Sequence, residues 1–291
     1  MIVECVPNFS EGRDLRIVAS IAEGAASVEG AWLLDTTSDP DHNRSVLTIA
    51  GNPESVIRAA FAAAQAALER IDLAKHAGAH PRVGAVDVIP IVPVYEISLE
   101  GCVALARELG RRIWNELRIP VFLYEGAALS DDRRRLENVR RLARGGAHPD
   151  IGEGRHPTAG AAVVGAREFL IAWNINLRTH DVEFARKVAR EIRESSGGFT
   201  RVKALGLRLE SRGETQVSVN LTDFRRTPLH VVFDAVAERC RATGIEIAGS
   251  ELIGMIPEAA LAASRGHDLH WLNLRPELVL ERRLRELGAI E

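Results

Sequence analysis

The chain has 291 residues, of which 46% are hydrophobic and 26% are charged, as in ordinary globular proteins. This composition excludes disordered, collagen-like and coiled-coil classes, and the length favours two domains. The formal net charge is -3, so no overall positive field favours nucleic acid or an anionic membrane, and any bound anion requires local basic residues.

The first half of the chain alternates between short apolar runs and amphipathic segments. Ser10 and Asp14 are helix-start residues, and Pro53 is well placed in a first helical turn. We predict strands at 2–9, 31–37, 44–50 and 85–94, with helices at 15–28 and 53–70. The order is βαββαβ. A helix at 98–117, a strand at 120–124 and an arginine-rich helix at 131–143 follow.

The second half repeats this order after a stretch rich in Gly, His and Pro, 145–160, which is the best candidate for a domain link. We predict strands at 168–177, 202–210, 215–221 and 245–254, with helices at 181–195 and 228–243. Two βαββαβ units predict an α+β fold with two ferredoxin-like subdomains, each an antiparallel sheet covered by two helices. We expect boundaries at 1–160, 161–265 and 266–291, the last a helical tail. Its amphipathic helix, 270–291, needs a partner for its apolar face.

The sequence HAGAHPRVGAVDVIP at 76–90 gathers residues that can carry chemistry. His76 and His80 have the spacing of many zinc sites, but Gly78 and Pro81 disfavour the helix that makes this spacing meaningful. No third ligand stands at a companion spacing, so we expect no metal. The cysteines lack CxxC spacing and predict core fillers rather than a disulfide framework: Cys5, Cys102 and Cys240.

His80 is a candidate proton acceptor, because an imidazole with a pKa near ~6.5 suits proton transfer at neutral pH. The structural alternative is that His80 hydrogen-bonds a backbone carbonyl and only shapes the turn. Arg82 would point to the same side of an extended segment, and nearby glycines let a ligand approach the backbone. These neighbours favour a catalytic turn.

Three other clusters have structural explanations of their own. In DPDHNRSV, Asn43 is an ordinary turn residue, whereas Arg44 exceeds what a hairpin turn requires. The glycines of HPDIGEGRHPTAGA, 148–161, indicate a ligand-covering loop only weakly, since the P-loop and dinucleotide patterns are absent. RRRLENVRRLARG, 133–145, is typical of a solvated helix face and could also attract a polyanionic tail.

Several motifs together closely resemble one family. In chain order they are VECVPNFSEG at 3–12, DHNRSV at 41–46, HAGAHPRVGAVDVIP at 76–90, IPVFLYE at 119–125, GAREFLIAWNINL at 165–177 and QVSVNLTD at 216–223. They resemble glutamate formiminotransferase, the transferase portion of formiminotransferase-cyclodeaminase, over residues 2 to about 262. The resemblance implies two ferredoxin-like subdomains, a homodimer, and tetrahydrofolate as co-substrate in a groove between them.

The resemblance also assigns residues. His80 would be the catalytic proton acceptor, and because some relatives carry a glutamate where this chain has Ala79, another group would have to orient His80 here. The implied folate-binding segment is Gly152, Glu153, Gly154, Arg155, His156, Pro157, Thr158, Ala159 and Gly160. From their places beside the motif turns, we predict Arg82 and Arg44 as bidentate clamps for glutamate carboxylates.

The implied reaction moves a formimino group between N-formimino-L-glutamate and N5 of tetrahydrofolate, in histidine degradation and one-carbon metabolism. One alternative is a related folate-dependent formyl or formimino transferase with another amino acceptor. Others are a non-catalytic amino-acid or folate-binding module and a metal-dependent hydrolase. The partners expected are small molecules and a second copy of the chain, with no nucleic acid and no membrane. Since the N-terminus carries no signal pattern and no apolar run could span a bilayer, we expect a cytoplasmic protein.

Overall fold

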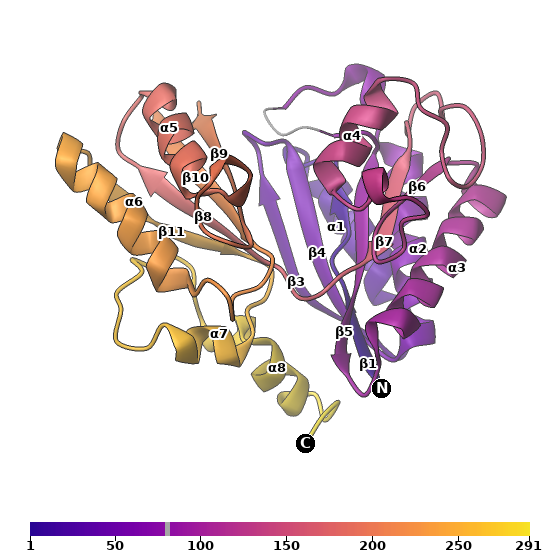
Figure 1. Ribbon diagram of the computed structural model, residues 1–291. Coiled ribbons are helices and arrows are strands. Elements are labelled where there is room, and N and C mark those ends of the chain that lie inside the picture. Colours follow the sequence, from indigo (N-terminus) through magenta and orange to yellow (C-terminus); the bar gives the residue numbers. More distant parts are fainter. Residues whose placement is uncertain (79–81) are drawn as a thin grey trace. The chain divides into compact units, whose positions relative to one another are not determined.

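The computed structural model describes residues 1–78 and 82–291 (Figure 1). Ala79, His80 and Pro81 lie outside the described residues. The chain divides into two compact units, Met1–Glu168 and Phe169–Glu291. The first unit extends past the boundary expected at 160, because the strand β7 (Ala162–Ala166), which the sequence reading overlooked, pairs in parallel with two strands of that unit. Residues 145–160 are therefore a loop within the first unit.

The first unit is built on one mixed sheet. Its seven strands are β1 (Ile2–Cys5), β2 (Asn8–Phe9), β3 (Ala31–Asp39), β4 (Arg44–Gly51), β5 (Val86–Tyr95), β6 (Val121–Glu125) and β7. The strand expected at 2–9 is divided in two at Pro7, which cannot donate a ladder hydrogen bond. Both halves pair with β4 on one side and β5 on the other, so they act as one interrupted strand.

Helices cover both faces of this sheet (Figure 1). Those of the first unit are α1 (Leu15–Ala26), α2 (Pro53–Arg70), α3 (Leu99–Leu117) and α4 (Leu136–Arg144). Side chains of α1, α2 and α3 share one apolar core with the sheet, whereas Val139 of α4 packs in a separate cluster with Phe122 and Val163 on the opposite face. The predicted helix starts are confirmed, since Asp14 and Asn52 cap α1 and α2 through their side chains.

The second unit has a four-stranded antiparallel sheet in the order β11-β8-β10-β9. The strands are β8 (Ile171–Leu177), β9 (Val202–Leu209), β10 (Glu214–Leu221) and β11 (Ile247–Ile253), and the helices are α5 (Val182–Ile192), α6 (Leu229–Thr243), α7 (Glu258–Ala263) and α8 (Leu280–Glu286). Both α5 and α6 cover one face (Figure 1). On that face Trp173 of β8 stacks on Phe233 of α6, with ring centroids 6.2 Å apart.

The helix expected over 270–291 is wrong for most of its length. Only α8 is α-helical there, after a single 3₁₀ turn at Pro276–Leu278. Backbone hydrogen bonds from Ile256 to Leu278 and from Leu280 to Ile256 tie this segment to the second unit, and Leu284 is fully buried. The apolar side chains of the tail are therefore already covered.

Two further expectations concern burial and membranes. Cys5, Cys102 and Cys240 are free and buried, which confirms them as core fillers. Burial raises the pKa of the Cys102 and Cys240 thiols to about 11, so neither is a thiolate at neutral pH. No helix in the part of the chain that the structure describes is long and apolar enough to cross a membrane.

Candidate active site

The motif turns converge at one end of the first unit. Ser10 joins the N-terminal motif to the end of the turn at 76–84, because its hydroxyl donates to Gly84 O (2.7 Å) and its amide to Ala85 O (2.9 Å). Gly12 crosses the hairpin loop so closely that a Cβ there would overlap backbone atoms of Asp39 and Arg44. The glycine of NFSEG is thus required by a close approach of two backbones.

Asn43 ties three segments together. Its Oδ1 accepts from Gly12 N (3.0 Å), and its Nδ2 donates to Ala77 O (3.0 Å). Its φ of 47° lies in the left-handed region, which asparagine tolerates better than most residues. The sequence reading treated Asn43 as an ordinary turn residue, but its buried side chain holds the hairpin loop to both neighbouring turns.

Arg82 fixes the same junction from the other side. Its guanidinium donates to Asn43 O (3.1 Å) and to His42 O (2.8 Å), and its Nη1 lies 2.8 Å from His76 Nδ1. A Cβ on Gly78 would overlap His42 O, so the turn lies directly against the hairpin loop. Burial and the neighbouring Arg82 lower the pKa of His76, which keeps this imidazole neutral at pH 7.

Asp87 is the buried carboxylate that organises the cluster. Its Oδ1 accepts from Val83 N (2.7 Å), while its Oδ2 accepts from Arg140 Nη2 (2.5 Å) and Arg44 Nη1 (3.3 Å). Asn8 holds Arg44 in place, since its Oδ1 accepts from Arg44 Nε (3.0 Å) and Nη2 (2.6 Å). Burial lowers the pKa of Arg44 to about 10, which still leaves it charged at pH 7.

The cluster carries excess positive charge. Arg44, Arg82 and Arg140 all lie close enough to Asp87 to affect one another's titration, and this one carboxylate cannot neutralise three guanidinium groups. Repulsion from Arg140 acts on both Arg44 and Arg82. Such a cluster attracts an anion, and a carboxylate matches the planar fork of arginine.

The expected folate segment joins the catalytic turn directly. Gly84 and Gly160 form an antiparallel bridge, Ala85 N donates to Ala159 O (2.9 Å) and Ala161 N donates to Val83 O (3.2 Å). His156 Nδ1 accepts from Ala159 N (3.0 Å) and closes the tip of the loop. A Cβ on Gly160 would overlap Val83 O, so this glycine is required by the close pairing.

The described residues match known families over almost the whole chain. Residues 2–167 match the model "Formiminotransferase domain, N-terminal subdomain", and residues 172–275 match the model "Formiminotransferase domain". The chain belongs to the formiminotransferase family. The resemblance inferred from the motifs is thereby confirmed.

Individual relatives agree with the family match. A glutamate formimidoyltransferase of Thermoplasma acidophilum is 40% identical over 100% of this chain and 99% of its own length. Another, of Streptococcus pyogenes serotype M1, is 42% identical over 89% of this chain and 90% of its own length. The formimidoyltransferase-cyclodeaminase of Gallus gallus is 41% identical over 89% of this chain, which covers 51% of that longer protein.

Within this family framework, the structure brings most of the predicted site residues together. Arg44, Arg82 and the segment 152–160 meet at the junction described above, and the predicted proton acceptor His80 lies outside the described residues. Gly152 through Arg155 are exposed, whereas Ala159 and Gly160 are buried in the bridge to the turn. The exposed part of the segment is therefore the part that a ligand can reach.

Sequence reasoning missed three members of the cluster. Asp87 looked like one more residue of a strand, Asn8 like a strand residue, and Arg140 like part of a solvated helix face. That last interpretation is wrong, because Arg140 is 8% exposed and donates to the buried Asp87. The only available signal was Asp87 itself, an acidic residue that interrupts an otherwise apolar strand.

A metal centre finds no set of ligands in the described part of the site. No group of three or more His, Cys, Asp or Glu residues within 1–78 and 82–291 could hold a metal ion. Both ring nitrogens of His76 lie beside the Arg82 guanidinium, at 2.8 Å and 2.5 Å. A bound cation there would be repelled by the arginine.

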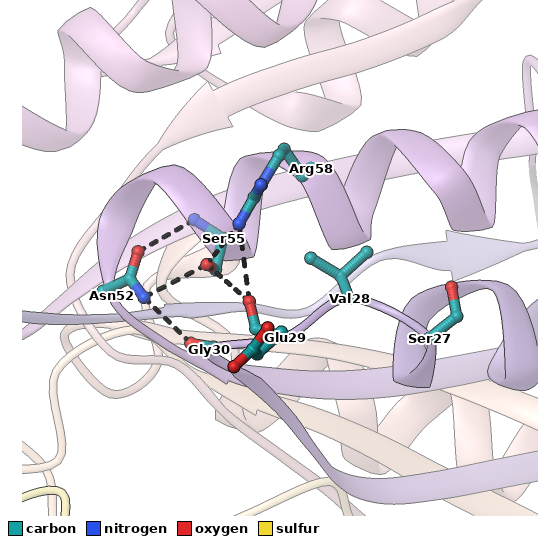
Figure 2. Close-up of a pocket in the computed structure, with 7 residues that line it drawn as sticks. All are labelled: Ser27, Val28, Glu29, Gly30, Asn52, Ser55 and Arg58. Carbon is teal, nitrogen blue, oxygen red and sulfur yellow. Dashed lines mark hydrogen bonds between the residues drawn. The ribbon is translucent and has the colours of Figure 1, made fainter.

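A shallow depression elsewhere on the first unit has a structural explanation (Figure 2). It lies at the start of α2, where Asn52 Oδ1 accepts from Ser55 N (2.9 Å) and Ser55 Oγ donates to Glu29 O (2.8 Å). Arg58 donates to Ser55 Oγ (2.9 Å). These groups satisfy each other as a helix cap, so we assign no binding function to the depression.

Proposed function

We propose that this chain is a glutamate formimidoyltransferase, which moves a formimino group between N-formimino-L-glutamate and N5 of tetrahydrofolate. The observation that carries the proposal is the 40% identity to a glutamate formimidoyltransferase over the whole of both chains. We place the reaction in histidine degradation and one-carbon metabolism. The convergence of the family motifs on one junction of the first unit supports the proposal.

The chemistry requires a proton acceptor. In one direction, N5 of tetrahydrofolate attacks the amidine carbon of N-formimino-L-glutamate and a tetrahedral intermediate forms. N5 loses its proton, and the glutamate nitrogen takes a proton as its bond to carbon breaks. We propose His80 as the group that accepts the first proton and returns it to the leaving nitrogen, a role typically worth ~10²–10⁴ in rate. The proposed reaction uses no metal.

We further propose that Arg44 and Arg82 bind carboxylates of the glutamate substrate. The excess positive charge around Asp87 supports this, because it needs an anion and N-formimino-L-glutamate carries two carboxylates. Asp87 would orient the turn that contains His80, since it holds Val83 N and both Arg44 and Arg140. It thereby takes the orienting role that Ala79 cannot fill.

Tetrahydrofolate would bind along Gly152–Gly160. The exposed backbone of Gly152–Arg155 allows a flat ring system to approach, and the Arg155 guanidinium suits the carboxylates of the folate tail. Gly154 has a φ of 67° and no neighbouring atom where a Cβ would stand, so space remains beside it. Ala159 and Gly160 would then support the loop rather than touch the ligand.

The finer architecture is part of the proposal. Counting β1 and β2 as one strand, the order β5-β1-β4-β3 in the first unit and β11-β8-β10-β9 in the second follow the same 4-1-3-2 pattern. This pattern supports two ferredoxin-like subdomains, the first extended by β6 and β7. A homodimer and a cytoplasmic location also belong to the proposal, as do small-molecule substrates without nucleic acid or membrane.

The decisive experiment incubates the purified protein with N-formimino-L-glutamate and tetrahydrofolate and follows the absorbance of formimino-tetrahydrofolate. We expect turnover by the wild type, and a loss of ~10²-fold or more in kcat for His80→Asn. His148→Asn, at an exposed histidine of the same unit, is the matched control and should retain activity. Binding of both substrates without turnover would overturn the transferase proposal in favour of a binding module.

The carboxylate assignment is tested by Arg44→Lys and Arg82→Lys. Each keeps the charge but loses the bidentate fork, so we expect the KM for N-formimino-L-glutamate to rise roughly tenfold or more. The KM for tetrahydrofolate should remain as in the wild type. An unchanged KM for N-formimino-L-glutamate in both variants would contradict the assignment.

A further inference from the structure

The second unit buries amide side chains on the sheet face opposite its helices. Along β8 and β10 the side chains alternate, so that Trp173, Ile175 and Val217 point into the apolar core. Asn176 and Gln216 point to the other face. A polar outer face is ordinary for an antiparallel sheet because water satisfies it. That explanation fails here, since Asn176 is 1% and Gln216 0% exposed.

The two amides form a pair with unused hydrogen-bonding capacity. They are direct cross-strand partners, and Gln216 Nε2 donates to Asn176 Oδ1 (2.9 Å). Asn176 Nδ2 and Gln216 Oε1 find no hydrogen-bond partner among the residues that the structure describes. If both amides were turned over, the pair would still leave one donor and one acceptor unused. A buried unpaired polar group costs free energy, so such a pair requires a reason.

We propose that the Asn176–Gln216 pair is a binding site for the lactam edge of a pterin, and this inference rests on the proposed function. The ring system of tetrahydrofolate presents a carbonyl oxygen next to a ring N–H. The carbonyl would accept from Asn176 Nδ2, while the N–H would donate to Gln216 Oε1. One ligand edge would satisfy both unused atoms.

The shared chemistry is an acceptor and a donor on neighbouring ligand atoms. The amidine of N-formimino-L-glutamate also has this arrangement, and the experiment must separate the two substrates. We favour the pterin because its lactam is neutral and rigid, whereas a protonated amidine carries donors alone and would leave Gln216 Nε2 or Asn176 Nδ2 facing another donor.

The test uses the variant Asn176→Leu/Gln216→Met, which keeps the side-chain volumes and removes the polar atoms. Binding to the full-length protein is measured by calorimetry with two fragments of folate, 6-methyltetrahydropterin and p-aminobenzoyl-L-glutamate. Loss of two hydrogen bonds should raise the Kd of the pterin fragment roughly ten- to hundredfold. The Kd of p-aminobenzoyl-L-glutamate should stay unchanged. Asn220→Leu, at an exposed residue on the same face of β10, should change neither.

Unfolding without ligand provides a second measurement. Because apolar groups replace buried unpaired ones, the double variant should have a Tm equal to or above that of the wild type. A lower Tm together with an unchanged Kd for the pterin fragment would overturn the inference, because the pair would then be structural. A rise in the KM for N-formimino-L-glutamate alone would also overturn it, in favour of the amidine. If the wild type binds the pterin fragment but does not turn over, the proposed function fails and the pterin site stands.

Discussion

The two units treat buried polar side chains in opposite ways. In the first unit, both oxygens of Asp87 accept hydrogen bonds, from one backbone amide and two arginines. In the second unit, Asn176 and Gln216 satisfy each other once and leave an N–H and a carbonyl oxygen unused among the described residues. An unpaired buried charge is far more costly than an unpaired amide, so the protein can leave a neutral pair, but not a carboxylate, for a ligand to complete.

Two asparagines make the same comparison within one residue type. Asn43 of the first unit uses its oxygen and its nitrogen to bind Gly12 and Ala77, and it thereby builds the junction. Asn176 of the second unit uses only its oxygen. We infer that the amide of Asn43 supports structure, while the amide of Asn176 is available for recognition.

The largest expected effect comes from removing the charge of the first unit's network. In Asp87→Asn the shape is kept, but three guanidinium groups lose their counter-charge, and the neutral amide cannot accept from both arginines and Val83 as the carboxylate does. We expect the free energy of unfolding to fall by about 3–5 kcal/mol, as when one partner of a buried ion pair is removed. Denaturant unfolding measures it, with activity as the second readout.

Asp132→Asn is the matched control, because Asp132 is an exposed carboxylate of the same unit. It should change the free energy of unfolding by no more than about 0.5 kcal/mol. If Asp87→Asn were as mild as this control, the network would not be the organising element of the junction, and the contrast between the units would disappear.

A second prediction concerns the bridge between the catalytic turn and the folate segment. In Gly84→Ala the new Cβ would overlap Ala161 O, and backbone on both sides prevents an easy shift. We expect a destabilisation of roughly 1–3 kcal/mol together with a raised KM for tetrahydrofolate. Gly145→Ala, whose new Cβ would come no closer than 3.3 Å to Arg141 O, should be nearly neutral in both measurements. Equal behaviour of the two variants would show that the bridge is not tight.

Much of the fold could be predicted from the sequence because the local signals agree with the tertiary structure. Asp14 and Asn52 cap helices where capping residues precede apolar periodicity, and the alternation of TQVSVNL gives β10 almost to its observed ends. The strand β7 was missed because AVVGA is short, fully buried and next to glycines, so it has no alternation. The tail failed because Pro276 and pairing with Ile256 outweigh its helical pattern.

The site was predictable only in part. Arg44, Arg82 and 152–160 lie in motifs and meet as expected, since each stands in a turn with unusual residues. Arg140 could not be recognised, because an arginine-rich helix gives no sign of which arginine faces the sheet. The unused atoms of Asn176 and Gln216 depend on a cross-strand register that no local pattern reveals.

A third prediction compares the two asparagines directly. Asn43→Gly keeps the left-handed backbone but loses the bonds to Gly12 and Ala77. We expect a destabilisation of about 1–3 kcal/mol by denaturant unfolding, because a buried N–H and a buried carbonyl lose their partners. Asn176→Leu should cost less than Asn43→Gly, since it frees only one acceptor's partner and removes an unsatisfied N–H. The reverse order would mean that Asn176 is the structural amide, against the inference drawn for the second unit.

The smallest expected effect is a pH dependence of the junction. Burial, only partly opposed by Asp39, lowers the pKa of His42 below its ordinary value of ~6.5. The unfolded chain therefore binds a proton at a higher pH than the folded one, so this contribution to stability is complete above ~6.5 and is lost as the pH falls toward the folded pKa. We expect the Tm of the wild type to fall between pH 7 and pH 5 more steeply than that of His42→Asn. His148→Asn, at an exposed histidine, should follow the wild type; parallel curves for wild type and His42→Asn would instead place the acid sensitivity outside this loop, for example at His76, whose pKa is lowered as well.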